Sequence, residues 1–122
     1  MEHVLESEAP LAETLLVQRV ARAHGFQRAG RIIRDRVMAI VEHAHFVEQE
    51  DTGGRFVWSG ADQQANWNLA RFPATLEDVR QIEDIPLGEL RAAKRGRDAV
   101  DVARGFGVRR LSALARSRIE NS

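Results

Sequence analysis

Apolar residues in the first third of the chain recur at the spacing of one helix face. Between residues 12 and 24 this pattern predicts an amphipathic helix. Gly25 ends that helix as a left-handed cap, and Phe26 can fold back over the last turn. A second helix is predicted over residues 29–45. Its buried stripe is expected to be Ile33, Val37, Ile40, Val41 and Ala44, and its outward face Arg31, Arg34, Asp35, Met38 and Glu42.

Alternating strand-like segments follow the second helix. Residues 46–50 and 55–58 flank the sequence Asp51-Thr52-Gly53-Gly54, which predicts a two-stranded β-hairpin. The order of helix, glycine turn, helix and hairpin is that of a winged helix-turn-helix. The fold class is therefore expected to be mainly α with a small β-hairpin, winged helix-turn-helix-like, with a second, shorter helix-turn-helix copy.

The rest of the chain returns to helical periodicity after a polar interval. Residues 59–75 are predicted to form a loop or linker, and residues 76–85 an acidic segment with at most a short helix before Pro86. Residues 87–106 are predicted to be helical with an interruption at Gly96, and residues 111–120 form the final helix. We expect a winged-helix-like unit at 1–58, a linker and acidic segment at 59–85, and an abbreviated unit at 86–122. The three parts are expected to pack as one compact domain.

An internal repeat accounts for that second unit. Residues 102–119 repeat residues 20–37, and the common sequence includes Val-Ala-Arg, a glycine two positions after the helix, and two later arginines. A repeat defines the architectural unit of a chain. Here the unit is a helix, a glycine turn and an arginine-rich helix, so Gly107 is expected to end a helix as Gly25 does.

Composition excludes several classes of protein. A chain of 122 residues is long enough for one modest core. The absence of cysteine excludes disulfides, a thiol nucleophile and cysteine-ligated zinc. No apolar run reaches the roughly 18 residues of a membrane span. The acidic start of the chain lacks the features of a signal peptide, so a cytoplasmic location is expected.

Charge is strongly segregated although the formal net charge is zero. The basic residues cluster in the two copies of the repeat, and the acids lie mainly outside them. All basic residues except Lys94 are arginine, whose planar fork suits phosphate groups and guanine edges. Genomic base composition is an alternative reason for the choice of arginine over lysine, but it does not explain the clustering.

The strongest candidate site lies at the start and outer face of the second helix. In helix-turn-helix proteins this helix enters the major groove of DNA. In the hairpin, Arg55 could reach a phosphate, but Glu48, Glu50 and Asp51 would repel one, which favours a wing that is structural or turned toward a protein partner. The candidate nucleic-acid-binding residues are Gln27, Arg28, Arg31, Arg34, Arg55, Arg109, Arg110 and Arg116. The simpler alternative is a solvated charged face.

Catalytic signals are weak. His43 and His45 point in nearly opposite directions on a helix, so they cannot share a metal ion. The Gly53-Gly54 sequence is a hairpin turn and not a phosphate-binding loop. We therefore expect no enzyme activity, no catalytic residue, no metal and no cofactor.

Several short motifs, in their order, resemble a known domain family. They are Glu8-Ala9-Pro10, the Arg-Val-Ala…Gly-Phe-x-Arg-x-Gly pattern within Val17 to Gly30, Ile33 to Val37, Gly54-Arg55-Phe56-Val57-Trp58, Ile82 to Leu90 with Ile85-Pro86, and the second Val-Ala-Arg…Gly-Val-Arg-Arg copy. The chain resembles a domain of unknown function at the C-terminal end of large superfamily-one helicases. In such proteins, helicase lobes and often a very-short-patch-repair-like endonuclease module precede this domain. The chain departs from the family pattern in the segment from Pro86 to Val102, which is shorter by about a helix, and in Ala29, which replaces a better capping residue.

The resemblance implies a winged-helix-like accessory module and transfers no catalytic residue. Two functions stay open. The chain is expected to bind DNA or RNA for a helicase-like protein, or else to be a protein–protein interaction module that docks on the parent helicase and nuclease modules. No membrane partner is expected, and the sequence leaves the oligomeric state undetermined.

Overall fold

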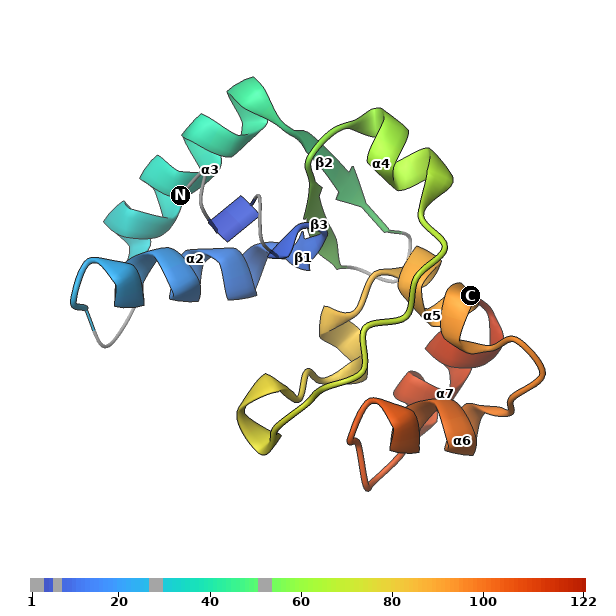
Figure 1. Cartoon of the computed structure of the whole chain (residues 1–122). Helices are drawn as coiled ribbons and strands as arrows, with labels where there is room; N and C mark the ends of the chain where they lie inside the picture. Colours follow the sequence, from blue (N-terminus) through green and yellow to red (C-terminus); the bar gives the residue numbers. More distant parts are fainter. Residues whose placement is uncertain (1–3, 6–7, 27–29, 51–53) are drawn as a thin grey trace. The chain divides into compact units, whose positions relative to one another are not determined.

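The computed structural model describes residues 4–5, 8–26, 30–50 and 54–122, apart from the side chains of residues 43 and 44. The chain divides into two compact units, Met1–Ala65 and Asn66–Ser122. Two longer helices and a small sheet make up most of the first unit, and short helices make up the second (Figure 1). The expected fold class, mainly helical with a small antiparallel sheet, is confirmed.

The first of the two predicted helices forms as α2 (Glu13–Ala23). Glu13 lies in its first turn and Arg22 in its last, so both charges complement the helix dipole. Gly25 follows with φ of +82°, a conformation that glycine adopts without steric cost. The buried residues of α2 form one stripe: Glu13, Leu16, Val17, Val20 and Ala21.

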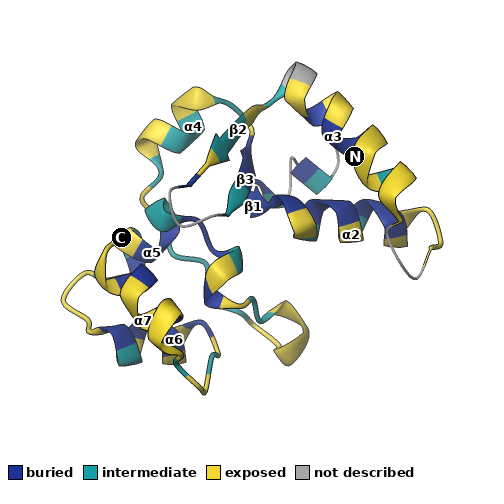
Figure 2. Cartoon of the chain, turned by 180° about the vertical axis from the view of Figure 1, so that it is seen from behind, coloured by how far each residue is buried: buried dark blue, intermediate teal, exposed yellow. Residues whose placement is uncertain are grey.

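The second helix, α3 (Arg31–Ala44), also forms where it was predicted, but it is rotated relative to the expected stripe. Val37 and Val41 are buried as expected, and Ile33 is partly buried. Met38, expected to face outward, is buried in the same core, whereas Ile40, expected to be buried, is 53% exposed. Figure 2 shows α3 exposed along much of its length, so its core-facing stripe is narrow.

A three-stranded antiparallel sheet completes the first unit, with the strand order β1-β3-β2. The predicted hairpin is confirmed: β2 (Phe46–Gln49) pairs with β3 (Arg55–Trp58), and Phe46 lies opposite Trp58. The sequence did not predict β1 (Leu11–Ala12), which pairs with the other edge of β3. Because β3 is central, all of Phe56, Val57 and Trp58 are buried.

The second unit begins at Asn66, the last residue of α4 (Ala61–Asn66), a helix that lies in the segment predicted as a loop. The unit contains η1 (Leu76–Asp78) and η2 (Ile82–Asp84). The segment expected as a linker at 59–85 therefore contributes to both units, and Ile82 and Ile85 belong to the core of the second. Three helices follow, α5 (Leu87–Ala93), α6 (Ala99–Gly105) and α7 (Ala113–Glu120). Gly96, with φ of +72°, lies between α5 and α6 and interrupts the helix at the predicted position.

Where both copies of the repeat are described, corresponding positions have the same secondary structure. α2 ends at Ala23 and α6 at the corresponding Gly105. α3 begins at Arg31 and α7 at the corresponding Ala113. Gly25 and Gly107 both follow a helix in the left-handed conformation, as predicted. In each unit the first helix of the copy packs against the second.

Candidate nucleic-acid interface

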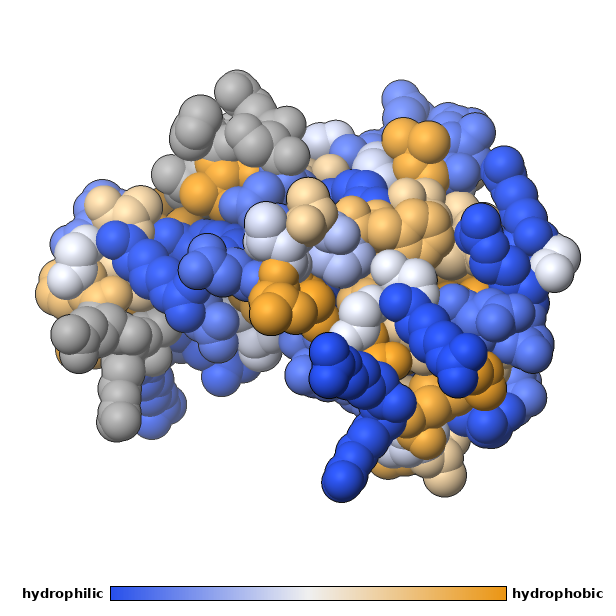
Figure 3. Space-filling model, turned by 60° about the horizontal axis from the view of Figure 1, so that its bottom comes forward, coloured by the Kyte–Doolittle hydropathy of each residue, from blue (hydrophilic) through white to orange (hydrophobic). Residues whose placement is uncertain are grey.

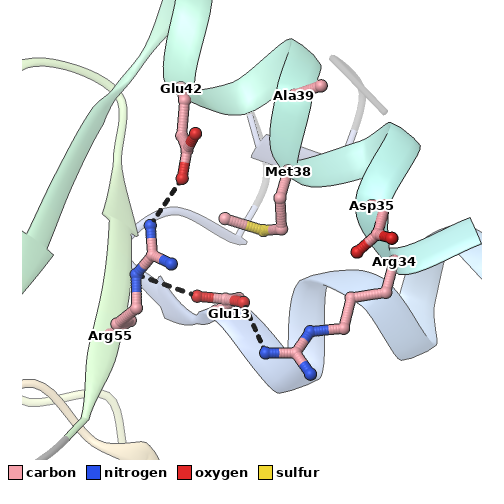
Figure 4. A pocket seen from close by; sticks show the side chains of 7 residues that line it. All are labelled: Glu13, Arg34, Asp35, Met38, Ala39, Glu42 and Arg55. Atoms are coloured by element: carbon pink, nitrogen blue, oxygen red, sulfur yellow. Dashed lines mark hydrogen bonds and ion pairs between the residues drawn. The ribbon is translucent and has the colours of Figure 1, made fainter. Parts of the chain in front are cut away.

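A cluster of charged side chains joins α2, α3 and β3 in the first unit (Figure 4). The carboxylate of Glu13 is almost fully buried and contacts two arginines. Arg34 donates from Nη2 to Glu13 Oε1 at 3.2 Å, and Arg55 Nε lies 3.1 Å from Glu13 Oε2. Arg55 also donates from Nη2 to Glu42 Oε1 at 2.7 Å. Two of the candidate nucleic-acid-binding residues therefore balance buried or neighbouring carboxylates.

The electrostatics of Arg55 agree with that role. The hydrogen bond to Glu42 raises the pKa of Arg55, burial lowers it, and the charges of Glu13 and Glu42 raise it further, with a net increase. The two carboxylates of the same unit thus stabilise the charged form of the guanidinium. A phosphate would have to compete with both carboxylates for it, so Arg55 is a weak candidate for nucleic-acid contact.

An open pocket of about 290 Å³ lies beside this cluster. Its lining contains more acidic than basic groups and has Met38 as its apolar part, as the labelled side chains in Figure 4 show: Glu13, Arg34, Asp35, Met38, Ala39, Glu42 and Arg55. Such a lining disfavours an anion. The pocket is therefore a poor site for a phosphate group.

The remaining candidates of the first unit divide into two groups. Arg31 is extended into solvent, with its side chain 93% exposed, and lies 3.8 Å from Asp35, which is a loose ion pair. Arg22 and Arg36 are also exposed. Gln27 and Arg28, which the sequence placed at the start of the second helix, lie outside the described residues. Arg31 is the described candidate in this unit that stays available to a ligand.

The second unit carries a more available set of arginines. Arg109 and Arg110 lie in the turn between α6 and α7, and Arg116 lies on α7 itself. All three are exposed, and no carboxylate within the described ranges forms an ion pair with them. Long hydrophilic side chains project beside apolar ones in the lower right of Figure 3. The copy of the repeat with the more available arginines is thus the second one.

Other basic residues of the second unit are structural. Arg118 is buried and donates to the carbonyl oxygens of Ile82 at 3.2 Å and Ile85 at 2.6 Å. Arg97 donates to the carbonyl of Ala93 and lies over the ring of Phe72. These arginines could not be distinguished from the exposed ones in the sequence, because Arg118 corresponds to the exposed Arg36 in the repeat.

Sequence reasoning also missed a buried carboxylate, Glu89, at the centre of the second unit. Arg80 donates to both carboxylate oxygens, at 3.0 and 2.6 Å, and Arg71 donates to the same group from its side chain and its backbone N–H. Burial alone would raise the pKa of Glu89, but the hydrogen bonds from Arg80 and Arg71 outweigh it and the pKa is lowered. Glu89 holds the segment before η2 onto α5.

The described residues meet neither the requirements of a metal site nor those of a membrane-spanning helix. Within them, no group of three or more histidine or acidic side chains is placed to hold a metal ion. The described helices are all too short or too polar to cross a bilayer.

Comparison with known proteins gives a match to a family model over the start of the chain. A family model described as "Protein of unknown function (DUF3320)" matches residues 1–35. This stretch includes α2, the glycine turn and the first turn of α3. No curated protein and no solved structure matches the chain. The match fits the resemblance to a domain of unknown function, and it ends near the start of α3.

Proposed function

We propose that the chain is a non-catalytic nucleic-acid-binding module, an accessory domain of a helicase-like protein. The observation that carries this proposal is the exposed arginine set of the second helix-turn-helix copy, Arg109, Arg110 and Arg116, with no ion-pair partner among the described carboxylates. Exposed arginines without counter-charges are the groups that neutralise backbone phosphates.

The arrangement of the helices supports the same proposal. In a helix-turn-helix the second helix presents its first residues to the bases while nearby cations contact the backbone. The turn before α7 supplies Arg109 and Arg110, and Arg116 follows within the first half of the helix. The first unit adds a second helix pair and a hairpin in the order of a winged helix, with Arg31 exposed on α3.

The β2–β3 hairpin, which takes the place of the wing in a winged helix, has a structural role in this proposal. Glu48 on β2 accepts a hydrogen bond from the indole N–H of Trp58 at 3.2 Å and another from Gln64 at 2.8 Å. These contacts join the hairpin to α4. Arg55 of the hairpin is also engaged in ion pairs within its own unit. The hairpin therefore supports α3 and is a poor element for binding phosphate.

A protein–protein interaction module is the second candidate function. The observation that favours it is the apolar surface near the end of α3, where Ile40 and Phe46 are both exposed. A nucleic-acid backbone would leave these two side chains in water, whereas a parent helicase or nuclease module could cover them. This candidate predicts association with such modules in the absence of nucleic acid.

A binding titration separates the two functions. Fluorescence anisotropy of labelled DNA duplexes of unrelated sequence, measured with the purified chain at several salt concentrations, is expected to give binding that weakens steeply with salt. Binding that is absent even at low salt, together with stable association with the helicase and nuclease modules of the same protein, would reject the nucleic-acid function in favour of the second.

The absence of catalysis is part of the proposal. The sequence contains no phosphate-binding loop and no thiol, so the chain has no evident means of activating a phosphoryl group. Purified chain is expected to hydrolyse neither ATP nor DNA. Hydrolysis that co-purifies with the folded chain and disappears with its removal would overturn this part.

A further inference from the structure

Two large apolar side chains occupy corresponding exposed positions in the two copies of the repeat. Ile32 is the second residue of α3 and is 71% exposed. Leu114 is the second residue of α7 and is 81% exposed. Their immediate neighbours differ, since Arg31 corresponds to Ala113 and Ile33 to Ala115. The repeat has therefore kept an apolar residue at an exposed position while other positions of the same turn changed.

Core packing does not account for these residues. α3 buries Val37, Met38 and Val41, and α7 buries Ala115 and Ile119. A single exposed leucine needs no explanation on a protein surface. Leu76, 87% exposed on η1, is such a case. Ile32 and Leu114 differ from it because each lies in the first turn of the helix that would enter a nucleic-acid groove.

The chemistry of the groove identifies a ligand for an apolar side chain at this place. The first turn of the second helix faces base edges in a helix-turn-helix. In the major groove of DNA, the C5 methyl group of thymine is the apolar feature that such a side chain can contact. Double-stranded RNA has uracil in place of thymine, and its major groove is too deep and narrow for side chains to read.

We propose that Ile32 and Leu114 contact thymine methyl groups, and that the partner of this chain is double-stranded DNA and not RNA. This inference rests on the proposed nucleic-acid function and adds the class of nucleic acid to it. Arg109 and Arg110 precede Leu114 by a few residues, and Arg31 directly precedes Ile32. These exposed cations supply backbone contacts next to each apolar contact.

Thymine and uracil in an otherwise identical DNA duplex provide the test. Two hairpin-closed DNA duplexes are compared, one of alternating adenine and thymine and the other with deoxyuridine at every thymine. The full chain is expected to bind the thymine duplex more tightly, by about fourfold for each methyl group that is buried. An RNA duplex of the same base order is expected to bind more weakly than either.

Variants assign the preference to the two side chains. Leu114→Ser and Ile32→Ser are expected to reduce the preference for thymine, and the double variant to remove it, with the salt dependence of binding unchanged. Leu76→Ser is the matched control, because it removes an equally exposed leucine outside the repeat helices. It is expected to keep the full preference. Thermal unfolding of each variant checks that the fold is intact.

Each outcome is decisive. Salt-dependent binding with equal affinity for the thymine and deoxyuridine duplexes overturns the methyl contact and leaves the nucleic-acid function standing. Equal or tighter binding of the RNA duplex overturns the assignment to DNA in the same way. A preference that Leu76→Ser also removes overturns the assignment to Ile32 and Leu114. Absence of binding to every duplex overturns the nucleic-acid function, and this inference with it.

Discussion

The backbone N–H of Val108 donates a hydrogen bond to the carbonyl oxygen of Ala103 at 2.9 Å, which closes the end of α6. At the corresponding positions of the first copy, Phe26 donates to Ala21 at the same distance of 2.9 Å. A second bond, from the glycine N–H to the preceding arginine carbonyl, is 3.0 Å long in both copies. Both helices thus end in a Schellman motif, with a left-handed glycine that orients the following turn.

Substitution of the two cap glycines should have unequal effects. Gly25→Ala forces alanine into the left-handed conformation, which costs about 1 kcal/mol, but an added Cβ would meet no atom within 4 Å. At Gly107 the added Cβ would also lie 2.8 Å from Cγ2 of Val79, so Gly107→Ala should destabilise more. Urea denaturation measures both. Gly60→Ala, with an ordinary φ and open space, is the control and should be close to neutral.

Loss of the Glu89 carboxylate should destabilise the second unit strongly. Glu89 is fully buried and satisfies both Arg71 and Arg80. Glu89→Gln leaves two guanidinium groups without their counter-charge, and we expect a loss of about 3 kcal/mol in the free energy of unfolding. Urea denaturation monitored by circular dichroism would show it. A variant as stable as the parent chain would contradict the assigned role.

The same carboxylate should make stability fall in acid. The folded-state pKa of Glu89 is lowered, so its contribution is fully present above the unfolded-state pKa of about 4.3 and is lost as the pH falls through the folded value. The difference in unfolding free energy between the parent chain and Glu89→Gln should therefore shrink as the pH falls below about 4.3. A difference that stays constant or grows in acid would contradict the lowered pKa.

The arginines of the first unit should differ in their effect on stability. Arg55→Ala should be the most destabilising, because Glu13 and Glu42 both lose a cation. Arg34→Ala should cost less, by about 0.5–1 kcal/mol, since its side chain is largely solvated and Arg55 still faces Glu13. Arg31→Ala should leave the melting temperature unchanged. A reversed order of Arg55 and Arg31 in thermal denaturation would show that the Glu13 cluster is not structural.

Local signals made much of the fold predictable from the sequence. The helices other than α4, the hairpin and both glycine caps each depend on a few consecutive residues, whose periodicity or backbone preference is visible without a partner. α4 lies in the polar segment that was predicted as a loop. β1 could not be predicted in this way. It is a two-residue strand, and the residues that pair with it, Phe56 and Val57, lie far away in the sequence.

The rotation of α3 shows a second limit of the sequence. Met38 and Ile40 lie on opposite sides of the Val37–Val41 stripe, and both are apolar, so periodicity alone cannot decide which one is buried. The sheet and α2 decide it by packing on the Met38 side. The same rotation brings Arg34 to Glu13, which is why an arginine predicted to face outward makes an internal ion pair.

The salt dependence of DNA binding tests the central claim most directly. Two triple variants lose the same charge from exposed arginines: Arg109, Arg110 and Arg116 to alanine in one, and Arg22, Arg91 and Arg95 to alanine in the other. Anisotropy titrations with one labelled DNA duplex at several salt concentrations give the slope of log affinity against log salt. We expect the first variant to lower this slope by about two to three units, roughly one for each phosphate contact, and the second by less than about one. Equal slopes for the two variants, or an unchanged slope in the first, would contradict nucleic-acid binding through the second helix-turn-helix copy.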